Sequence, residues 1–385
     1  MEQDTPPSAA AIPAPTAPPP PPLAPPPPLA PLPPARRKSR GWMIASFILL
    51  ALLLLSVVAN FGWLMGDMLG VVETSASSSA DPRMDEIVVR EHRGSDKILV
   101  VSLDGIITSG MGGGGISIVD VLKAQFHRAE KDDNIKAVLL KVDSPGGEVL
   151  ASDEIFKAVL RFQEKTGKPV VCSMGSLAAS GGYYVAVGAR WIVANELTIT
   201  GSIGVIMGTY NFRGLMDKVG VVPVTFKSGR YKDMLSMTKE PDSVTPEEKA
   251  MVQGLIDETF GRFKDVVLQG RSRANKENAK GSDKGRKLND DWKNFADGRI
   301  LSGSEAFKLG FVDELGDFDT AVERTEKIAG TGKCKLVEYR IRVDFADLFR
   351  LFGKAETGKV KIDLGIQMPQ MQAGKVYFLS PTYLQ

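Results

Sequence analysis

The middle of the chain alternates strand-like runs with helical patterns, and this alternation constrains the fold more than any other feature. A β-branched run at 97–108 predicts a buried strand, and the pattern at 116–132 predicts a helix. A second strand at 135–147 ends in a glycine turn, and a helix at 148–167 leads to a third strand at 168–175. Strands that alternate with helices predict an α/β fold with a largely parallel sheet and helices outside it.

The alternation continues with further strands at 190–196 and 198–206 and a strand segment at 221–226. Residues 244–271 then predict a long helix, because a threonine N-cap, a proline in the first turn and a glutamate three residues after the cap form a capping-box pattern. The charged stretch at 275–291 predicts a solvated insert.

The N-terminal part of the chain predicts a membrane anchor. Residues 1–34 hold 16 of the 24 prolines and cannot bury a core, so we expect a disordered tail. The tail ends in a basic cluster of Arg36, Arg37, Lys38 and Arg40. The following run, 41–66, carries no charge and is long enough to span a bilayer. The small residues at 75–80 would suit a cleavable signal peptide, but the length of the apolar run favours a retained single-pass anchor.

Charge asymmetry sets the expected orientation. The basic cluster precedes the apolar run and the first charges after it are acidic, which places the N-terminus in the cytoplasm and the rest of the chain outside, at the cytoplasmic (inner) membrane. The predicted organisation is a proline-rich tail, an anchor, a linker, an α/β domain and a C-terminal extension with possible oligomer contacts. Their respective bounds are 1–40, 41–66, 67–95, 96–330 and 331–385.

Composition excludes several classes of function. With 48 basic and 46 acidic residues, the chain as a whole offers no argument for nucleic-acid binding. Cys172 and Cys334 are the only cysteines, and we expect two separately buried thiols rather than a disulfide. The only histidines, His92 and His127, stand beside no plausible nucleophile, which argues against a Ser-His-Asp triad. No zinc motif is present, so we expect neither a metal nor a cofactor.

Ser180 opens the small-residue stretch SGGYY and has two interpretations. A serine before a short helix is a favoured N-cap, since its oxygen accepts a bond from a free backbone N–H. If it is instead a nucleophile, the scarcity of histidine leaves lysine as the candidate base, and a lysine serves when its amine is uncharged.

Four local features support the nucleophile. The stretch DSPGG (143–147) ends a strand with two glycines, and the N–H of Gly181 stands at a helix N-terminus that favours an oxyanion. The turn TGSIGV contains Ser202, and the stretch FKSGRYKDM supplies Lys227 and Lys232. Each of these alone is an ordinary turn or surface residue.

The order of these motifs resembles signal peptide peptidase A, a family of membrane-anchored Ser-Lys peptidases. The resemblance covers about residues 97–320 through DSPGG, ASGGYY, TGSIGV, SGRYKD and ADGRILSGSEAFKLGFVDELG, in a single copy typical of the short form. It implies a crotonase/Clp-protease-like spiral of ββα units for the domain at 96–330. The proline-rich tail and the insert at 275–291 depart from the family pattern.

The resemblance also assigns roles to residues. It implies that Ser180 is the nucleophile, Lys232 the general base and Ser202 the hydroxyl that orients the lysine amine, with Gly181 and Gly147 as oxyanion-hole donors. It further implies an endopeptidase that degrades signal-peptide remnants and other short hydrophobic segments. Its partners would be these peptides and further copies of the chain, in a ring whose sites are shared between protomers.

Two other functions stay open at this point. The chain could be an inactive membrane scaffold of the same fold, although intact serine and lysine candidates argue against it. It could also be an acyl-CoA hydratase or isomerase of the crotonase superfold. That reaction needs paired carboxylates and a pocket for coenzyme A. An export anchor argues against it, because coenzyme A is a cytoplasmic ligand.

Overall fold

The computed structural model describes residues 46–50, 52–53, 56, 84–110, 117–281, 283–342 and 377–379. The chain divides into two units, 1–78 and 79–385. In the first unit, residues 46–50 are helical and expose apolar side chains such as Phe47 and Leu49. No helix among the described residues combines the length and apolarity needed to cross a bilayer. The predicted tail at 1–40 and most of the predicted anchor lie outside the described residues.

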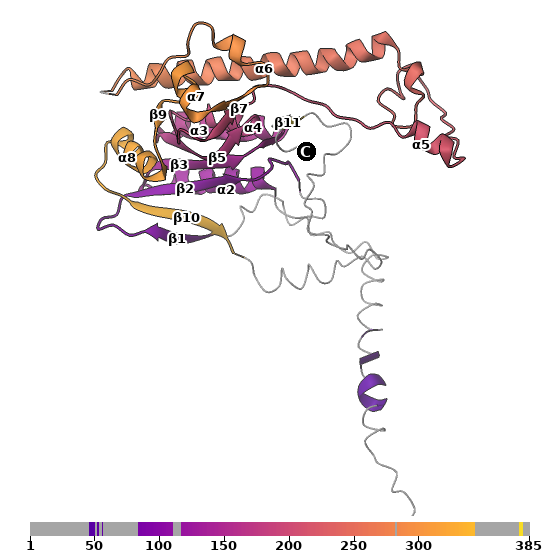
Figure 1. The fold of residues 1–385 in the computed structure, drawn as a ribbon. Helices are drawn as coiled ribbons and strands as arrows, with labels where there is room; N and C mark the ends of the chain where they lie inside the picture. The colour runs from indigo at the N-terminus through magenta and orange to yellow at the C-terminus, as the bar shows by residue number, and fades with distance from the viewer. Residues whose placement is uncertain are drawn as a thin grey trace, which may run out of the picture. The chain divides into compact units, whose positions relative to one another are not determined.

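The second unit is built on a mostly parallel sheet (Figure 1). The strands along its main path, in spatial order, are β1 (Met84–Arg90), β10 (Lys335–Ile341), β2 (Lys97–Asp104), β3 (Ile135–Ser144), β5 (Val170–Ala179), β6 (Trp191–Ala194) and β9 (Glu314–Leu315). All neighbours from β10 to β9 are parallel, and β1 is antiparallel to β10. The structure confirms the predicted α/β class with a largely parallel sheet.

Four short strands lie off this path. β7 (Ile199–Gly201) continues parallel to the end of β5, and β8 (Ile300–Ser302) pairs antiparallel with β7. β4 (Gly146–Glu148) forms a separate pair with β11 (Tyr377–Leu379). These strands gather at the carboxyl end of β5, which is the end that carries Ser180.

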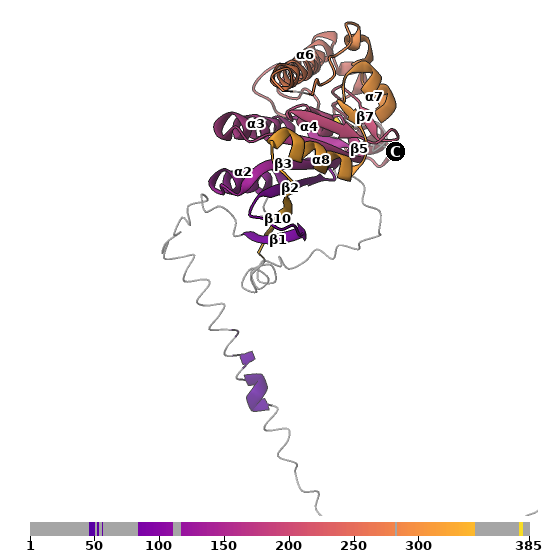
Figure 2. The ribbon, with the colours of Figure 1, turned by 90° about the vertical axis from the view of Figure 1, so that its left-hand side faces the viewer.

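Helices cover both faces of the sheet, as Figure 2 shows. In β2, Leu99 and Val101 belong to the core under α2 and α3, while Ile98 and Val100 belong to the core under α8. The alternation of side chains along a strand therefore buries both faces. The helices are α2 (Ile118–Lys131), α3 (Val149–Thr166), α4 (Gly181–Ala186), α5 (Arg213–Lys218), α6 (Pro246–Asn278), α7 (Gly303–Leu309) and α8 (Phe318–Ala329), with short 3-10 turns at Pro241–Ser243 and Trp292–Phe295.

Helix α6 begins where the sequence predicts but runs further. The Thr245 and Glu248 side chains form the predicted capping box. The helix ends at Asn278 rather than near residue 271, because the Asn278 amide donates to the Arg190 carbonyl at 3.0 Å and accepts from Arg190 Nε at 3.0 Å. The predicted insert at 275–291 is therefore partly helical, and it is also held by Asp283, which forms ion pairs with Arg324 and Lys327 on α8.

Other predicted boundaries also differ from the structure. Strand β1 lies in the segment expected to be a linker, and β11 lies in the expected C-terminal extension. The prediction of a strand at 221–226 is wrong, since this segment pairs with no strand among the described residues and exposes most of its side chains. Cys172 and Cys334 are both free and buried, as predicted.

Candidate active site

Ser180 occupies a strained turn between β5 and α4. Its backbone lies at φ 53° and ψ −118°, a combination that residues with side chains rarely adopt. The turn is held by the Ser180 N–H, which donates to the Gly201 carbonyl at 2.8 Å, and by the Ser180 carbonyl, which accepts from the Tyr184 N–H at 2.8 Å.

The Ser180 side chain does not cap the helix. It makes no capping hydrogen bond, and Oγ is buried without a hydrogen-bond partner within the described part of the chain. A buried polar atom without a partner costs stability, so its presence calls for an explanation. The structure therefore does not support the interpretation of Ser180 as a helix N-cap.

The glycines next to Ser180 bring two backbone segments together. A Cβ placed on Gly181 would lie 3.1 Å from the backbone nitrogen of Gly147 and 2.6 Å from Ser152 Oγ, so a larger residue there forces its neighbours to shift. A Cβ placed on Gly146 would lie 2.7 Å from the Gly181 nitrogen. The N-terminus of α4 and strand β4 are therefore in close backbone contact, with the nitrogens of Gly147 and Gly181 near one another.

Ser202 lies in the turn beside Ser180. It follows β7, whose Gly201 is paired with Ala179 and accepts the bond from the Ser180 N–H. Ser202 is buried, also has a positive φ of 49°, and donates its N–H to the Arg299 carbonyl at 2.7 Å. Four of the predicted site residues thus meet at the end of β5.

Lys232 is not brought to this place within one chain. It lies in the arm formed by residues 207–245, which includes α5 and extends away from the sheet (Figure 1). Lys227, the other lysine of the motif, forms an ion pair with Asp233 at 2.8 Å, and the bond from Lys227 holds the pKa of Asp233 below its usual value. Lys232 is exposed, and its amine has no hydrogen-bond or ion-pair partner among the described residues.

A hollow of about 520 Å³ adjoins the site. It is lined by Ser109, Glu148, Val149, Leu150, Asp153, Tyr184, Glu258, Thr259 and Arg262. Burial raises the pKa of Tyr184, so its phenol stays protonated and donates to Asp153 at 2.7 Å. Burial alone would raise the pKa of Asp153, but bonds from Lys157, Tyr184 and Arg262 hold it below its usual value.

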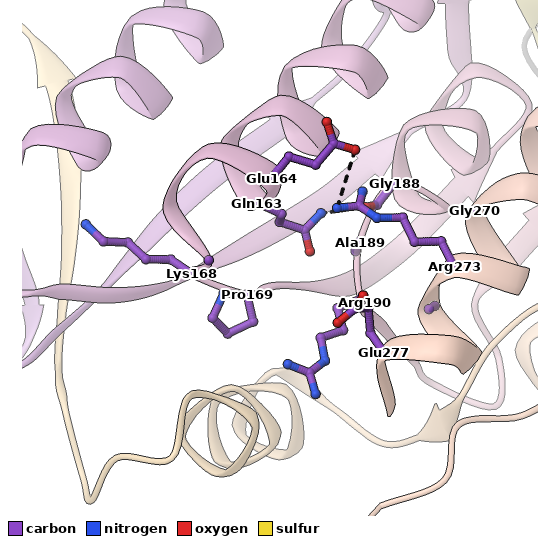
Figure 3. A pocket seen from close by; sticks show the side chains of 12 residues that line it. Gln163, Glu164, Lys168, Pro169, Gly188, Ala189, Arg190, Gly270, Arg273 and Glu277 are labelled. Atoms are coloured by element: carbon purple, nitrogen blue, oxygen red, sulfur yellow. Dashed lines mark hydrogen bonds and ion pairs between the residues drawn. The ribbon is translucent and has the colours of Figure 1, made fainter. Parts of the chain in front are cut away.

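The hollow drawn in Figure 3 is separate from the one beside Ser180. It lies between the end of α3, the turn before β6 and α6, and it is crossed by an ion pair between Glu164 and Arg273 at 3.8 Å. Among the described residues, its lining contains none of the candidate site residues.

Sequence reasoning missed two contributors to the site. The Asp143 carboxylate accepts from the Leu177 N–H at 3.0 Å and so fixes β5 shortly before Ser180. Its place at the start of DSPGG was a usable signal. Strand β11 also pairs with β4 beside Gly147, and the short apolar run VYFL near the end of the chain was its only signal.

Comparison with known proteins gives a consistent picture. The model of peptidase family S49 matches residues 162–331. A Synechocystis protein provisionally named protease slr0021 is 40% identical over 234 residues, which cover 61% of this chain and 75% of that protein. An Enterococcus faecium protein provisionally named signal peptide peptidase SppA is 36% identical, over 56% of this chain and 58% of that protein.

More distant relatives share smaller parts of their length. The chloroplastic serine protease SPPA of Arabidopsis thaliana is 30% identical over 60% of this chain and 32% of that protein. The chain thus spans less than two thirds of this relative and of the Enterococcus protein. A solved membrane-bound stomatin-specific protease aligns at 17% identity over 60% of this chain and 85% of that chain, with a TM-score of 0.36. The identity to the Synechocystis protein and the matching family model establish that this chain belongs to peptidase family S49, the serine proteases related to signal peptide peptidase A.

Proposed function

We propose that the chain is an endopeptidase with a Ser-Lys dyad, in which Ser180 is the nucleophile and Lys232 the general base. The observation that carries this proposal is the buried Ser180 hydroxyl, which lacks a partner among the described residues and sits on a strained turn beside the Gly181 and Gly147 nitrogens. Strain and an unsatisfied polar atom are tolerated where function requires them.

The proposed chemistry follows from this arrangement. Ser180 Oγ attacks the scissile carbonyl carbon, and neutral Lys232 takes the hydroxyl proton and later gives it to the leaving amine. The N–H groups of Gly181 and Gly147 bind the oxyanion, a contribution of about 3–4 kcal/mol per donor. Ser202 orients the lysine amine. Water then hydrolyses the acyl-enzyme.

The lysine would come from a neighbouring copy of the chain. The arm that carries Lys232 exposes large apolar side chains, which are typical of a surface covered by a partner. They are Tyr210, Phe212, Leu215, Val219, Val221, Val222, Val224 and Phe226. A ring of copies would cover this surface and would place each arm at a neighbour's Ser180. Burial there favours the uncharged amine that a general base needs.

The proposed substrates are spent signal peptides and other short hydrophobic segments. The relative from Enterococcus, with its signal peptide peptidase name, supports this choice. The apolar run at 41–66 would anchor the enzyme in the cytoplasmic membrane with its N-terminus inside and its catalytic domain outside, close to where such peptides are left.

A serine-directed fluorophosphonate probe tests the nucleophile. We expect the wild-type chain to be labelled and Ser180→Ala to be unlabelled, with peptidase activity reduced at least about a thousandfold. Ser173→Ala is the matched control, since Ser173 is a buried serine of β5, the strand that ends just before Ser180, and it should label normally. Equal labelling of the Ser180→Ala chain would refute the assignment, and absence of labelling from every chain would favour the inactive scaffold.

Mixing two inactive variants tests the shared site. Ser180→Ala and Lys232→Ala protein, dissociated and reassembled together, should regain part of the wild-type activity, because some sites then combine an intact serine with an intact lysine. Mixed assemblies that form and stay inactive would show that each site belongs to one chain.

A further inference from the structure

The loop that carries Lys232 is folded around the side chain of Lys227. The Lys227 ammonium donates to both carboxylate oxygens of Asp233 at 2.8 Å and to the Arg230 carbonyl at 3.2 Å. These bonds use all three donors of the ammonium group. Inside the loop that they close, the Lys232 N–H donates to the Gly229 carbonyl at 3.2 Å. The backbone on both sides of Lys232 is therefore held by bonds that the Asp233 carboxylate completes.

Asp233 also connects this loop to helix α6. The Lys239 ammonium lies 3.7 Å from Asp233 Oδ1 and donates to Glu248 Oε1 at 2.6 Å. Glu248 is fixed in turn, because Oε2 accepts from the Thr245 N–H at 2.9 Å in the capping box of α6. The side chains of Asp233 and Lys239 are only 15% and 14% exposed, and that of Glu248 is 3% exposed. The Asp233 carboxylate thus lies between two ammonium groups and is linked through one of them to the start of α6.

The charges of these four side chains, which we call the Asp233 cluster, balance one another. Its members are Lys227, Asp233, Lys239 and Glu248. The bond from Lys227 holds the pKa of Asp233 below its usual value, and the bond from Lys239 does the same for Glu248. The bond to Glu248 raises the pKa of Lys239. The cluster therefore holds two positive and two negative charges at neutral pH, and it fixes the loop without adding net charge beside Lys232.

A general base on an arm needs such support. The structure does not bring Lys232 to Ser180 within one chain, so the groups around Ser180 do not hold its loop before the proposed contact between copies. A catalytic group that moves freely loses the alignment on which the rate depends.

We infer that Asp233 is a positioning residue, which fixes the loop so that Lys232 is presented to the serine of a neighbouring copy. The inference rests on the proposed function, because it takes Lys232 as the general base. Lys227, whose donors are all used inside the loop, is then a structural cation rather than a second base.

Asp233→Asn in the full-length chain tests this inference. It should lower kcat by at least about tenfold and leave KM within about twofold, because Asp233 acts on the lysine rather than on the substrate. Asp233→Glu keeps the charge and should retain more of the wild-type kcat. Asp217→Asn is the matched control, since Asp217 is an aspartate of the same arm that pairs with Arg213 at 2.9 Å within α5. Its kcat should stay within about twofold of the wild type.

The pH dependence of kcat/KM gives a readout that a loss of stability does not imitate. The rate rises as the Lys232 amine loses its proton, which produces the acid limb of the profile. Asp233→Asn removes a negative charge, favours the uncharged amine and should move this limb to lower pH by about half a unit. Lys227→Met removes a positive charge and should move the limb to higher pH by a similar amount.

The other charged groups near these positions are the same in both variants. On the arm and at the start of α6 they are Arg230, Lys239, Glu247 and Glu248, and beside Ser202 they are Asp297 and Arg299, which pair with each other. A variant that is only unstable loses activity without two shifts of opposite sign. Opposite shifts therefore support the inference even where a variant is poorly folded.

The outcomes separate the two proposals. If Lys232→Ala is inactive while Asp233→Asn and Lys227→Met keep the wild-type acid limb, the positioning inference is wrong and the assignment of Lys232 stands. If Asp233→Asn does not fold, an acid limb of Lys227→Met that is unchanged or moves to lower pH overturns the inference. If Lys232→Ala retains activity, the assignment of the base fails, and the positioning inference fails with it.

Discussion

Ser180 should lower the stability of the protein, because its backbone is strained and its hydroxyl is buried without a partner in the part of the chain that the structure describes. Replacing Ser180 by alanine removes the hydroxyl and retains the backbone strain. Replacing it by glycine removes both. We therefore expect both inactive variants to be more stable than the active enzyme.

The magnitudes follow from these two features. An unsatisfied buried polar atom costs about 1–3 kcal/mol, so Ser180→Ala should raise the free energy of unfolding by about 1 kcal/mol or more. Relief of the positive φ adds about 1–3 kcal/mol in Ser180→Gly, offset by about 0.5–1 kcal/mol for the greater freedom of glycine in the unfolded chain. For a domain of this size, each kcal/mol shifts the melting temperature by about 2–4 °C.

Urea denaturation of the wild type and the two variants measures their free energies of unfolding and so tests whether both variants are more stable. Ser144→Ala is the contrast, since Ser144 Oγ is buried and accepts from the Gly146 N–H at 3.1 Å, so its loss should destabilise the protein. A Ser180→Ala chain that unfolds more easily than the wild type would refute the reasoning, because it would show that the hydroxyl is held by a stabilising bond.

Three further predictions concern the surroundings of the site. Gly181→Ala should reduce kcat by at least about a hundredfold while the chain still folds, since the added methyl group would lie against Ser152 Oγ and the proposed oxyanion donors; unchanged kcat would exclude this oxyanion hole. Asp313→Ala should lower the free energy of unfolding by about 3–5 kcal/mol in urea titrations, because it leaves the buried Arg271 guanidinium unpaired; a loss below about 1 kcal/mol would contradict this. Folding lowers the pKa of Asp153, so its stabilising contribution is present above about pH 4 and is lost as the pH falls through the folded-state pKa. The stability difference between the wild type and Asp153→Asn should therefore shrink below pH 4, and a difference that grows with acidity would be inconsistent with this sign.

Local patterns predicted the elements that are stabilised locally. The capping box at the start of α6 and the strand periodicity of β2 and β3 involve residues near one another in sequence, and the structure contains them where expected. The separate burial of Cys172 and Cys334 was also predictable, because two cysteines without a motif behave as small apolar residues.

Strands at the edges of the sheet were not predictable from the sequence. β1 exposes most of its side chains and is stabilised by backbone bonds to β10, which lies far along the chain. The predicted strand at 221–226 has a comparable apolar run but finds no partner among the described residues. A short apolar run becomes a strand only when tertiary structure supplies the neighbouring edge.

The sequence by itself determined the α/β class, because periodicity is a local property of the chain, and it supplied candidate site residues through short motifs and their resemblance to a known family. Only the tertiary structure decided that Ser180, Ser202, Gly147 and Gly181 meet at the end of β5 while Lys232 lies on a separate arm. It also decided that β11 pairs with β4. These arrangements depend on backbone hydrogen bonds and close glycine contacts between distant segments, which no local pattern encodes.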